Sequence, residues 1–276
     1  MRISVIVPSK GCVYLKYLLF GLREQSVRPN EVILVLKECD VKSVEELCRM
    51  YSLSCVIIEQ KKGYFTHALN IGKKEASGDI LIFTDNDVIP LKKWVQKYIT
   101  LHRKYQKIAG ICSRDIYLDL KNKKLLPTPD DKPTVRLYRW LARTWLEPPY
   151  PLFKKYRLGV YLTRKLDIAH GPHIPGKTCY SLPLRGVNMS FKQEYVYDVW
   201  FPEHPGLKRA LGNEQFFGIQ LVLKGFDTMY TPYNPVLHIT REESLSRTAV
   251  REEVGLEFKV MRSLYRDLLN TYGYSL

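Results

Sequence analysis

Two carboxylates lie two residues apart in Asp85-Asn86-Asp87, directly after the apolar run DILIFT that spans Asp79–Thr84. A turn that leaves a buried strand can present both side chains to one cleft, where paired carboxylates require a cation. Hard oxygen ligands suit Mg²⁺ or Mn²⁺, and such an ion can bridge a diphosphate. The alternative is a plain polar turn with asparagine at its tip. Because the pair follows a predicted central strand, we favour the metal site.

The elements around this pair alternate between strand and helix. Strands that are apolar on both faces and separated by helices indicate an α/β fold with a mainly parallel sheet, covered on both sides. Right-handed crossovers place the carboxyl ends of such strands on one edge, where α/β proteins bind ligands. The predicted strands are Ile3–Pro8, Glu31–Leu36, Ser54–Glu59, Asp79–Thr84 and Lys107–Leu118, and the predicted helices are Leu15–Gln25, Val44–Tyr51, Tyr64–Ala76 and Leu91–Tyr105.

The second half of the chain is less regular. Residues 122–133 predict a loop or hairpin, and the prolines within 147–177 predict irregular structure. Helical periodicity is present in Thr134–Leu146, Asn213–Lys224 and Ser246–Tyr272, and strand patterns are present in Leu182–Phe191, Thr228–Tyr230 and Val236–Ile239. The apolar stripe of the last helix would fit the sheet, a dimer or a membrane, and consists of Val250, Val254, Phe258, Met261, Tyr265 and Leu268.

Composition excludes several classes of protein. With 276 residues, of which 45% are hydrophobic, the chain can bury a large core and is not disordered. No apolar run approaches the roughly 18 residues that span a bilayer, and the N-terminus lacks a signal-peptide pattern. We therefore expect a cytoplasmic protein. Its six cysteines show no metal-binding spacing and are expected to be mostly buried thiols without disulfides.

Four stretches occur in a fixed order: ISVIVPSKG from residue 3, GYFTHALNIGKKEASGDILIFTDND from residue 63, RGVNMSFK from residue 185, and GNEQFFGIQLVLKGF with TPYNPVLHI from residues 212 and 231. In order and spacing they resemble glycosyltransferase family 2, which has the Rossmann-like GT-A fold. The resemblance implies a catalytic domain at 1–240, with a nucleotide-sugar-binding half at 1–118 and an acceptor-side half at 119–240. The acceptor-side half would contain a basic, aromatic insertion at 132–177. A C-terminal amphipathic helical segment would follow at 241–276.

The resemblance also implies a reaction, the metal-dependent, inverting transfer of a sugar from a nucleotide-diphosphate sugar to an acceptor. Asp85 and Asp87 would hold Mn²⁺ or Mg²⁺ and the ribose-diphosphate, and His238 would complete the metal coordination. The cation would stabilise charge on the departing diphosphate, and a carboxylate on the opposite face would take the acceptor proton. The aspartate usual at that position is replaced by Glu214, which we expect to be the base. The alternative is an acid that only stabilises a helix N-terminus.

Further site residues follow from the same resemblance. Pro8 and Ser9 would line the nucleotide pocket through backbone groups, and Asn70 would hold its helix beside the nucleotide. Gly186 and Asn188 would line the acceptor side, although a glycine there can also serve a tight backbone path. The acceptor would be a glycan, a protein or a polyprenyl phosphate.

The end of the second strand departs from the family pattern. Family members often carry an aspartate there that reads the nucleotide, but here Leu36 or Lys37 takes the position, followed by Glu38 and Asp40. The sequence therefore does not predict which base the sugar donor carries, and donors with guanosine are candidates as well as donors with uridine. The departure also favours an alternative function, a degenerate protein that binds a nucleotide sugar or a membrane without turnover. A nucleotidyltransferase would carry a glycine-rich phosphate loop after the first strand, and the match here is poor.

The stretch Lys132–Lys165 carries nine Lys or Arg residues and one acid, Glu147, in a chain of net charge +15. On the predicted helix Thr134–Leu146, the basic face holds Arg136, Arg139 and Arg143, and the apolar face holds Leu137, Tyr138, Leu141 and Trp145. This pattern fits an in-plane helix on an anionic membrane, which would suit a polyprenyl-phosphate acceptor and a peripheral position on the inner face of a membrane. The alternatives are a helix packed on its own domain and, third, single-stranded nucleic acid. The lack of a recognised nucleic-acid module argues against the third.

Overall fold

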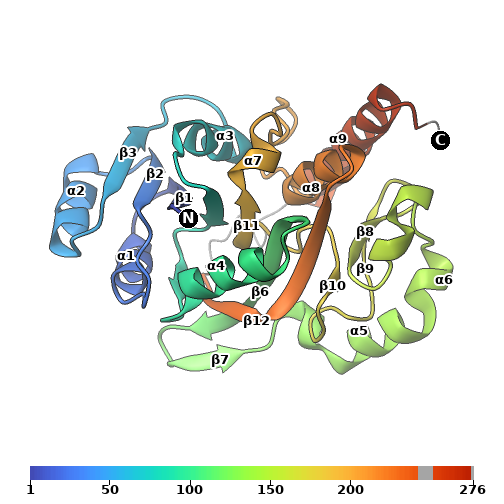
Figure 1. The fold of residues 1–276 in the computed structure, drawn as a ribbon, viewed down its shortest axis with the longest axis horizontal. Helices are drawn as coiled ribbons and strands as arrows, with labels where there is room; N and C mark the ends of the chain where they lie inside the picture. Colours follow the sequence, from blue (N-terminus) through green and yellow to red (C-terminus); the bar gives the residue numbers. More distant parts are fainter. Residues whose placement is uncertain (242–250, 275–276) are drawn as a thin grey trace.

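The computed structural model describes residues 1–241 and 251–274, and the side chains of 142–144 and 251 lie outside this description. Strands and helices alternate through the first half of the chain (Figure 1). The strands are β1 (Ile3–Lys10), β2 (Glu31–Lys37), β3 (Cys55–Glu59), β4 (Ile80–Thr84), β5 (Val88–Pro90), β6 (Ile108–Asp119), β7 (Lys124–Leu126), β8 (Val160–Leu162), β9 (Ile168–His170), β10 (Cys179–Tyr180), β11 (Asn188–Lys192) and β12 (Asp227–Ile239). The α-helices are α1 (Leu15–Arg23), α2 (Val41–Met50), α3 (Phe65–Glu75), α4 (Trp94–Lys104), α5 (Pro133–Tyr138), α6 (Thr144–Leu146), α7 (Gln193–Val196), α8 (Asn213–Leu223) and α9 (Arg251–Thr271), joined by the tighter or wider turns η1 (Pro129–Asp131), η2 (Arg139–Arg143) and η3 (Pro151–Tyr156).

One large sheet runs through both halves of the chain, in the order β10-β12-β6-β11-β4-β1-β2-β3. Strands β3, β2, β1 and β4 are parallel, so their carboxyl ends share one edge. Strand β11 runs antiparallel between β4 and β6, and β12 is parallel to β6. The predicted α/β architecture is therefore confirmed, but the sheet is parallel only across β3, β2, β1 and β4 and is mixed where β11, β6 and β12 pair.

Helices cover both faces of the sheet because its strands are apolar on both faces. Along β1, Val5 and Val7 belong to a core that α1, α2 and α4 complete. The side chain of Ile6 points to the opposite core, which includes buried residues of α3, α8 and α9. Figure 1 shows the two helical layers on either side of the strands. The strand ends between these layers are thereby held rigidly at one edge.

Strand β12 is longer than its sequence suggests. The sequence predicts two short strands separated by two prolines, whereas the structure has one continuous strand over Asp227–Ile239. The register against β6 shifts between Thr231 and Val236, so the prolines fall in an irregularity where no ladder hydrogen bond is needed. By contrast, the strand predicted over 182–191 is confined to β11, because the chain reaches the sheet only at Asn188.

The insertion at 132–177 is more ordered than its prolines suggest. The predicted helix over 134–146 is confirmed as α5, η2 and α6, which follow one another without a break. Residues expected to be irregular instead form η3 and an antiparallel hairpin of β8 and β9. The expected hairpin near 122–133 is present as β6 and β7, followed by η1.

The C-terminal helix α9 packs on its own domain. Met261, Tyr265 and Leu269 are buried in the core that also contains α8. This contact decides among the three packings that the sequence left open, while Val250 and the predicted start of the helix lie outside the described residues. Within the described parts of the chain, no helix is long and apolar enough to cross a membrane.

The cysteine prediction is wrong in one respect. Cys12 and Cys39 form a disulfide, with their Cα atoms 5.5 Å apart. Their separation of 27 residues carries no recognisable motif, but the parallel pairing of β1 and β2 brings the loops after both strands together. Cys48 and Cys112 are buried free thiols, as expected.

Candidate active site

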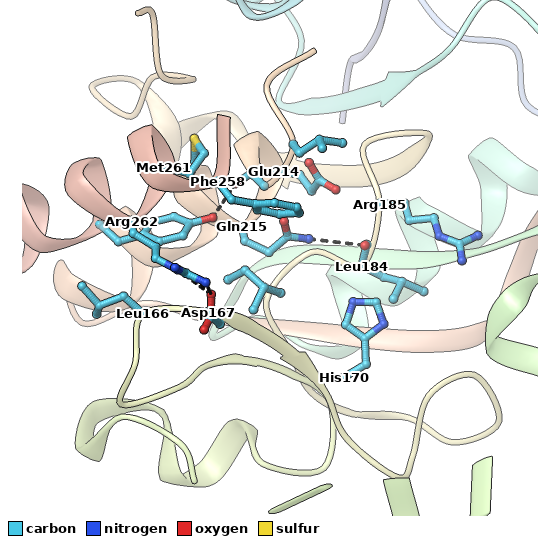
Figure 2. Close-up of a pocket in the computed structure, with 14 residues that line it drawn as sticks. Leu166, Asp167, His170, Leu184, Arg185, Glu214, Gln215, Phe258, Met261 and Arg262 are labelled. Carbon is cyan, nitrogen blue, oxygen red and sulfur yellow. Dashed lines mark hydrogen bonds and ion pairs between the residues drawn. The ribbon is translucent and has the colours of Figure 1, made fainter. Parts of the chain in front are cut away.

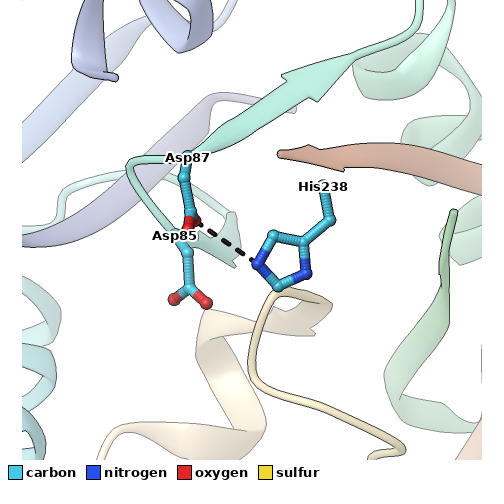
Figure 3. Close-up of side chains that lie close together, drawn as sticks. All are labelled: Asp85, Asp87 and His238. Atoms are coloured by element: carbon cyan, nitrogen blue, oxygen red, sulfur yellow. Dashed lines mark ion pairs between the residues drawn. The ribbon is translucent and has the colours of Figure 1, made fainter. Parts of the chain in front are cut away.

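The turn after β4 holds the two predicted metal-binding carboxylates, Asp85 and Asp87. Between them, Asn86 is buried and donates hydrogen bonds to Ser9 Oγ at 2.7 Å and to the Gly11 carbonyl at 2.8 Å. Ser9 lies near the carboxyl end of β1 and Gly11 follows that strand, so the tip of the turn is tied to the neighbouring strand. The Asp87 carboxylate is directed at His238 of β12, and the Asp85 carboxylate lies beside it (Figure 3).

His238 reaches the same point from the far end of the sequence. Strands β5 and β12 pair antiparallel with Val88 opposite His238, and the Ile239 N–H donates to the Asp87 carbonyl at 2.9 Å. One ligand atom from each of Asp85, Asp87 and His238 lies within 4.8 Å of the others (Figure 3). The structure therefore brings together the three residues that the sequence predicts as metal ligands.

Burial and charge set the ionisation of these side chains. Burial, with the nearby charge of Asp87, raises the pKa of Asp85 to about 6. Burial acts likewise on Asp87, but the charges of His238 and Arg241 and a hydrogen bond from Arg241 outweigh it, so the pKa of Asp87 lies below its usual value. For His238, the hydrogen bond to Asp115 and the negative charges of Asp87 and Asp85 outweigh burial and raise the pKa to about 10. Without a metal ion, the protonated imidazole of His238 and the guanidinium of Arg241 supply the positive charge that the carboxylates need. A divalent cation would take the place of the proton on His238 Nε2.

Two features show that this cluster fits a divalent cation. Asp87 Oδ1 is buried without a hydrogen-bond partner, which is rare for a carboxylate oxygen unless an ion takes that place. His238 Nδ1 lies 3.0 Å from Asp115 Oδ2, which leaves Nε2, 3.5 Å from Asp87 Oδ1, for the ion. A carboxylate that orients a ligating imidazole is a common outer-sphere arrangement. The oxygen-rich set suits Mn²⁺ or Mg²⁺.

Asp115 was not among the expected site residues. It lies inside β6, three residues after the apolar run of that strand ends at Cys112, so it lacks the strand-end signal that identifies Asp85. Two arginines were also missed. Arg241 places Nε 2.6 Å from Asp87 Oδ2, and Arg185 bridges Asp115 and Asp130 at 2.6 and 2.5 Å. Both arginines contact carboxylates of the metal cluster or its surroundings, so their positive charge would favour an anionic ligand there.

Glu214 lines a cavity of about 460 Å³ beside this cluster. Figure 2 shows its carboxylate among residues of the β8–β9 hairpin, the start of α8 and one face of α9. Gly212 precedes α8 with a φ of +91°, and a Cβ there would meet Tyr265 Oη at 2.5 Å. The Tyr265 hydroxyl donates to the Gly212 carbonyl at 3.0 Å, so α9 fixes the helix start that carries Glu214. A carboxylate so placed can accept a proton from a molecule in the cavity.

The sequence profile of glycosyl transferase family 2 matches residues 4–164, more than half of the chain. The chain belongs to this family. No curated protein sequence matches it significantly. The family assignment agrees with the site geometry, because the profile covers the strand ends and the turn that carries Asp85 and Asp87.

Solved glycosyltransferases share the fold. TarS of S. aureus, residues 1–349 in complex with UDP, superposes with a TM-score of 0.56 at 16% identity over 99% of this chain and 72% of that one. GalNAc-T7 with UDP, GalNAc and Mn²⁺ has a TM-score of 0.64 at 15% identity, over 88% of this chain and 44% of that one. The mannosyltransferase PcManGT of Pyrobaculum calidifontis, with GDP-Man and Mn²⁺, has a TM-score of 0.57 at 14% identity, over 99% and 73%. The chain spans 43% of the longer TarS structure.

In this family 2 chain, the residues that the sequence predicts beside the nucleotide sugar come from two elements, Pro8 and Ser9 from the carboxyl end of β1 and Asn70 from α3. Pro8 is buried in β1 opposite Val35. The Ser9 hydroxyl donates a hydrogen bond to the Gly11 carbonyl and accepts one from Asn86. Both residues therefore have only backbone groups to offer to a nucleotide. Asn70 is buried in α3 and exchanges hydrogen bonds with Phe201 and Glu203. Its amide therefore fixes the loop after α7 to α3.

The loop after β2 is shaped by caps and by the disulfide. Asp40 accepts hydrogen bonds from the Lys42 N–H and the Ser43 hydroxyl at the start of α2. Glu38 is exposed, has a φ of +57° and lies 3.6 Å from Lys10. Of the two acids that the sequence offers for nucleotide contact, Asp40 is thus engaged in capping and Glu38 is accessible.

The two acceptor-side candidates have different surroundings. Gly186 is half-buried next to Arg185 in the cavity wall, and the nearest atom to an added Cβ is 4.0 Å away, so tight packing does not require glycine. Asn188 is fully buried. Its Oδ1 accepts from Trp94 Nε1 at 2.9 Å and from Tyr98 Oη at 2.6 Å. Its side chain therefore cross-links the core in this structure.

Replacing Asn188 with alanine is expected to lower stability by about 3 kcal/mol, because buried donors on Trp94 and Tyr98 lose their acceptor. The Asn188 amide also donates to the carbonyls of Arg114 and Asn234, which would lose that donor. Urea denaturation measures the loss, and transfer assays measure KM for the acceptor. Unchanged stability with a raised acceptor KM would instead assign Asn188 to acceptor binding.

The rate of transfer is expected to rise with pH through about 7. Burial raises the pKa of Glu214 to about 7, with a smaller contribution from the charge of Asp85. Only the ionised carboxylate can take a proton, so the rate should increase tenfold per pH unit below this value and level off above it. A metal on Asp85 removes only the smaller contribution, and burial remains. A kcat profile that is flat from pH 5 to 8 would contradict this role.

Proposed function

We propose that the protein is a metal-dependent, inverting glycosyltransferase that uses a nucleotide-diphosphate sugar. The observation that carries the proposal is the meeting of Asp85, Asp87 and His238 beside a cavity that Glu214 lines. Family membership supports it, and solved structures of the same fold contain UDP, UDP-GlcNAc or GDP-Man.

Asp85, Asp87 and His238 would hold Mn²⁺ or Mg²⁺, which when bound supplies Lewis-acid stabilisation of the charge that develops on the leaving diphosphate. Arg241, whose guanidinium lies beside Asp87, would add positive charge near the leaving diphosphate. Glu214 accepts the proton of the acceptor hydroxyl while that oxygen bonds to the anomeric carbon and the bond to the diphosphate breaks. Attack from the face opposite the leaving group inverts the configuration at the anomeric carbon.

The acceptor enters the cavity in this proposal. Its walls combine apolar side chains such as Leu184 and Phe258 with the charged groups of Arg185 and His170. A glycan, a protein hydroxyl or a polyprenyl phosphate could each present a hydroxyl or phosphate oxygen to Glu214. A polyprenyl-phosphate acceptor would place the protein peripherally on the inner face of a membrane.

Incubation with UDP- and GDP-sugars tests the proposal, with Mn²⁺, Mg²⁺ or EDTA and one acceptor of each class. We expect release of one nucleoside diphosphate and a product heavier by one sugar, both dependent on the cation. The alternative function, a degenerate protein that binds without turnover, predicts a bound nucleotide sugar and no release under any condition. Product formed equally well in EDTA would overturn the metal dependence.

A further inference from the structure

The helical segment from α5 through η2 to α6, residues 133–146, exposes large apolar side chains to solvent. Trp140 is 72% exposed and Trp145 is 89% exposed, and both lie on one short segment with other exposed apolar residues, not scattered singly over the surface. Four further large residues on the segment are more than one-third exposed. Together these six form the outer face: Leu137, Tyr138, Trp140, Leu141, Trp145 and Leu146.

A buried arginine keeps this face turned outward. Arg139 is only 7% exposed, and its Nη2 lies 2.5 Å from Asp130 Oδ1 and 3.2 Å from His170 Nδ1. Asp130 is also held by Arg185 at 2.5 Å. Turning the helix to bury its tryptophans would expel Arg139 and break its buried ion pair with Asp130, so this pair favours the observed orientation. The helix is thus inverted, with a cation inside and the apolar face outside.

This orientation corrects the expected division of the helix into two faces. Arg136 is exposed as predicted, but Arg139 is buried, and the side chain of Arg143 lies outside the described residues. The alternative of an amphipathic helix packed by its apolar face on its own domain is contradicted by the exposure of that face.

Basic side chains flank the outer face in the sequence. Exposed cations lie just before it, within it and in the stretch that follows: Lys132, Arg136, Lys154, Lys155, Arg157, Arg164 and Lys165. Of these, Lys155 pairs with Asp227. The nearby acids Asp130 and Asp131 are each paired with arginine. Aromatic and aliphatic residues rimmed by cations match the boundary of an anionic bilayer, where apolar groups insert and basic groups meet lipid phosphates. A second copy of this chain, with net charge +15, would bring like charges together.

We propose that the outer face of 133–146 is a docking surface for an anionic phospholipid membrane. Docking of this kind needs no catalytic turnover and therefore stands apart from the proposed transferase activity. Its position has a consequence for that activity. The inward-facing Arg139 contacts His170, which lines the acceptor cavity, so a docked helix would hold the cavity close to the lipid surface.

Co-sedimentation with vesicles tests the docking surface. Neutral phosphatidylcholine vesicles are compared with vesicles that contain phosphatidylglycerol, without nucleotide or metal. We expect binding to the anionic vesicles and a blue shift of tryptophan fluorescence. Trp140→Ser with Trp145→Ser should weaken binding at least roughly tenfold. Tyr233→Ser removes an exposed aromatic elsewhere and should bind like wild type. Wild-type affinity in the double tryptophan variant would overturn the proposal.

Charge reversal tests the second half of the proposal. Lys132→Glu with Arg136→Glu should reduce binding to anionic vesicles roughly tenfold or more, and added salt should weaken wild-type binding. Lys42→Glu with Arg49→Glu makes the same charge change on α2, at the opposite end of the molecule (Figure 1), and should have a much smaller effect. Equal losses of vesicle binding in both charge variants would show only a general attraction of the basic protein to anionic lipid, and would overturn a docking surface at 133–146. Tryptophan-dependent dimers in lipid-free sedimentation, with no vesicle binding, would assign the face to a second copy.

Discussion

Replacing Asp87 with alanine is expected to abolish metal-dependent sugar transfer. The variant loses the buried Oδ1 that lacks a hydrogen-bond partner, together with the contacts of that carboxylate to His238 and Arg241. Loss of Lewis-acid stabilisation worth about 4 kcal/mol lowers the rate roughly a thousandfold. Nucleoside diphosphate release at saturating donor measures the effect, and far-ultraviolet circular dichroism checks the fold.

The matched control is Asp267→Ala, an exposed aspartate on α9 whose carboxylate has no described bond near the site. It removes the same side chain and should retain wild-type activity. A folded Asp87→Ala protein that transfers sugar at the wild-type rate with the same dependence on Mn²⁺ would remove Asp87 from the metal site.

Replacing Glu214 with glutamine is expected to stop transfer while donor binding persists. Glutamine has nearly the same shape but cannot take the acceptor proton, so kcat should fall by roughly 10²–10⁴-fold. The donor KM should change little, because Glu214 lines the cavity and is not one of the metal ligands. Steady-state kinetics with varied donor concentration separate the two parameters.

Glu252→Gln, on the exposed side of α9, makes the same chemical change away from the cavity and should leave kcat intact. If Glu214→Gln keeps full activity, another group is the base. Asp198 and Glu203, acids that precede α8 in the sequence, are not among the residues that line this cavity. Lys224 pairs with Asp198, and His67 pairs with Glu203.

The metal site could be anticipated because local signals determined it. An apolar strand that ends in two carboxylates placed Asp85 and Asp87 at the sheet edge, and the motif order supplied His238. The residues that contact the metal ligands from outside could not be predicted from the sequence. Asp115 and Arg185 meet only because β11 enters the sheet antiparallel between β4 and β6, which is a long-range pairing that no local pattern encodes.

The inverted helix shows a limit of hydrophobic periodicity. The pattern in 134–146 correctly predicted a helix with an apolar side, but periodicity does not say which side faces the protein. That choice depends on Asp130, a single buried acid that pairs with Arg139. The disulfide between Cys12 and Cys39 was missed for a similar reason, because only the pairing of β1 with β2 brings the two loops together.

Thermal denaturation of the wild type and of Asp87→Ala, with a panel of nucleoside diphosphates with and without Mn²⁺, tests the central claim most directly. A nucleotide at a hundredfold excess over its Kd stabilises the folded state by about 2.7 kcal/mol, which raises Tm by roughly 5 °C or more. We predict that one nucleotide raises Tm of the wild type only when Mn²⁺ is present, and that Asp87→Ala shows no such shift. An equal shift in EDTA, or no shift with any nucleotide, would contradict a metal-dependent donor site at Asp85, Asp87 and His238.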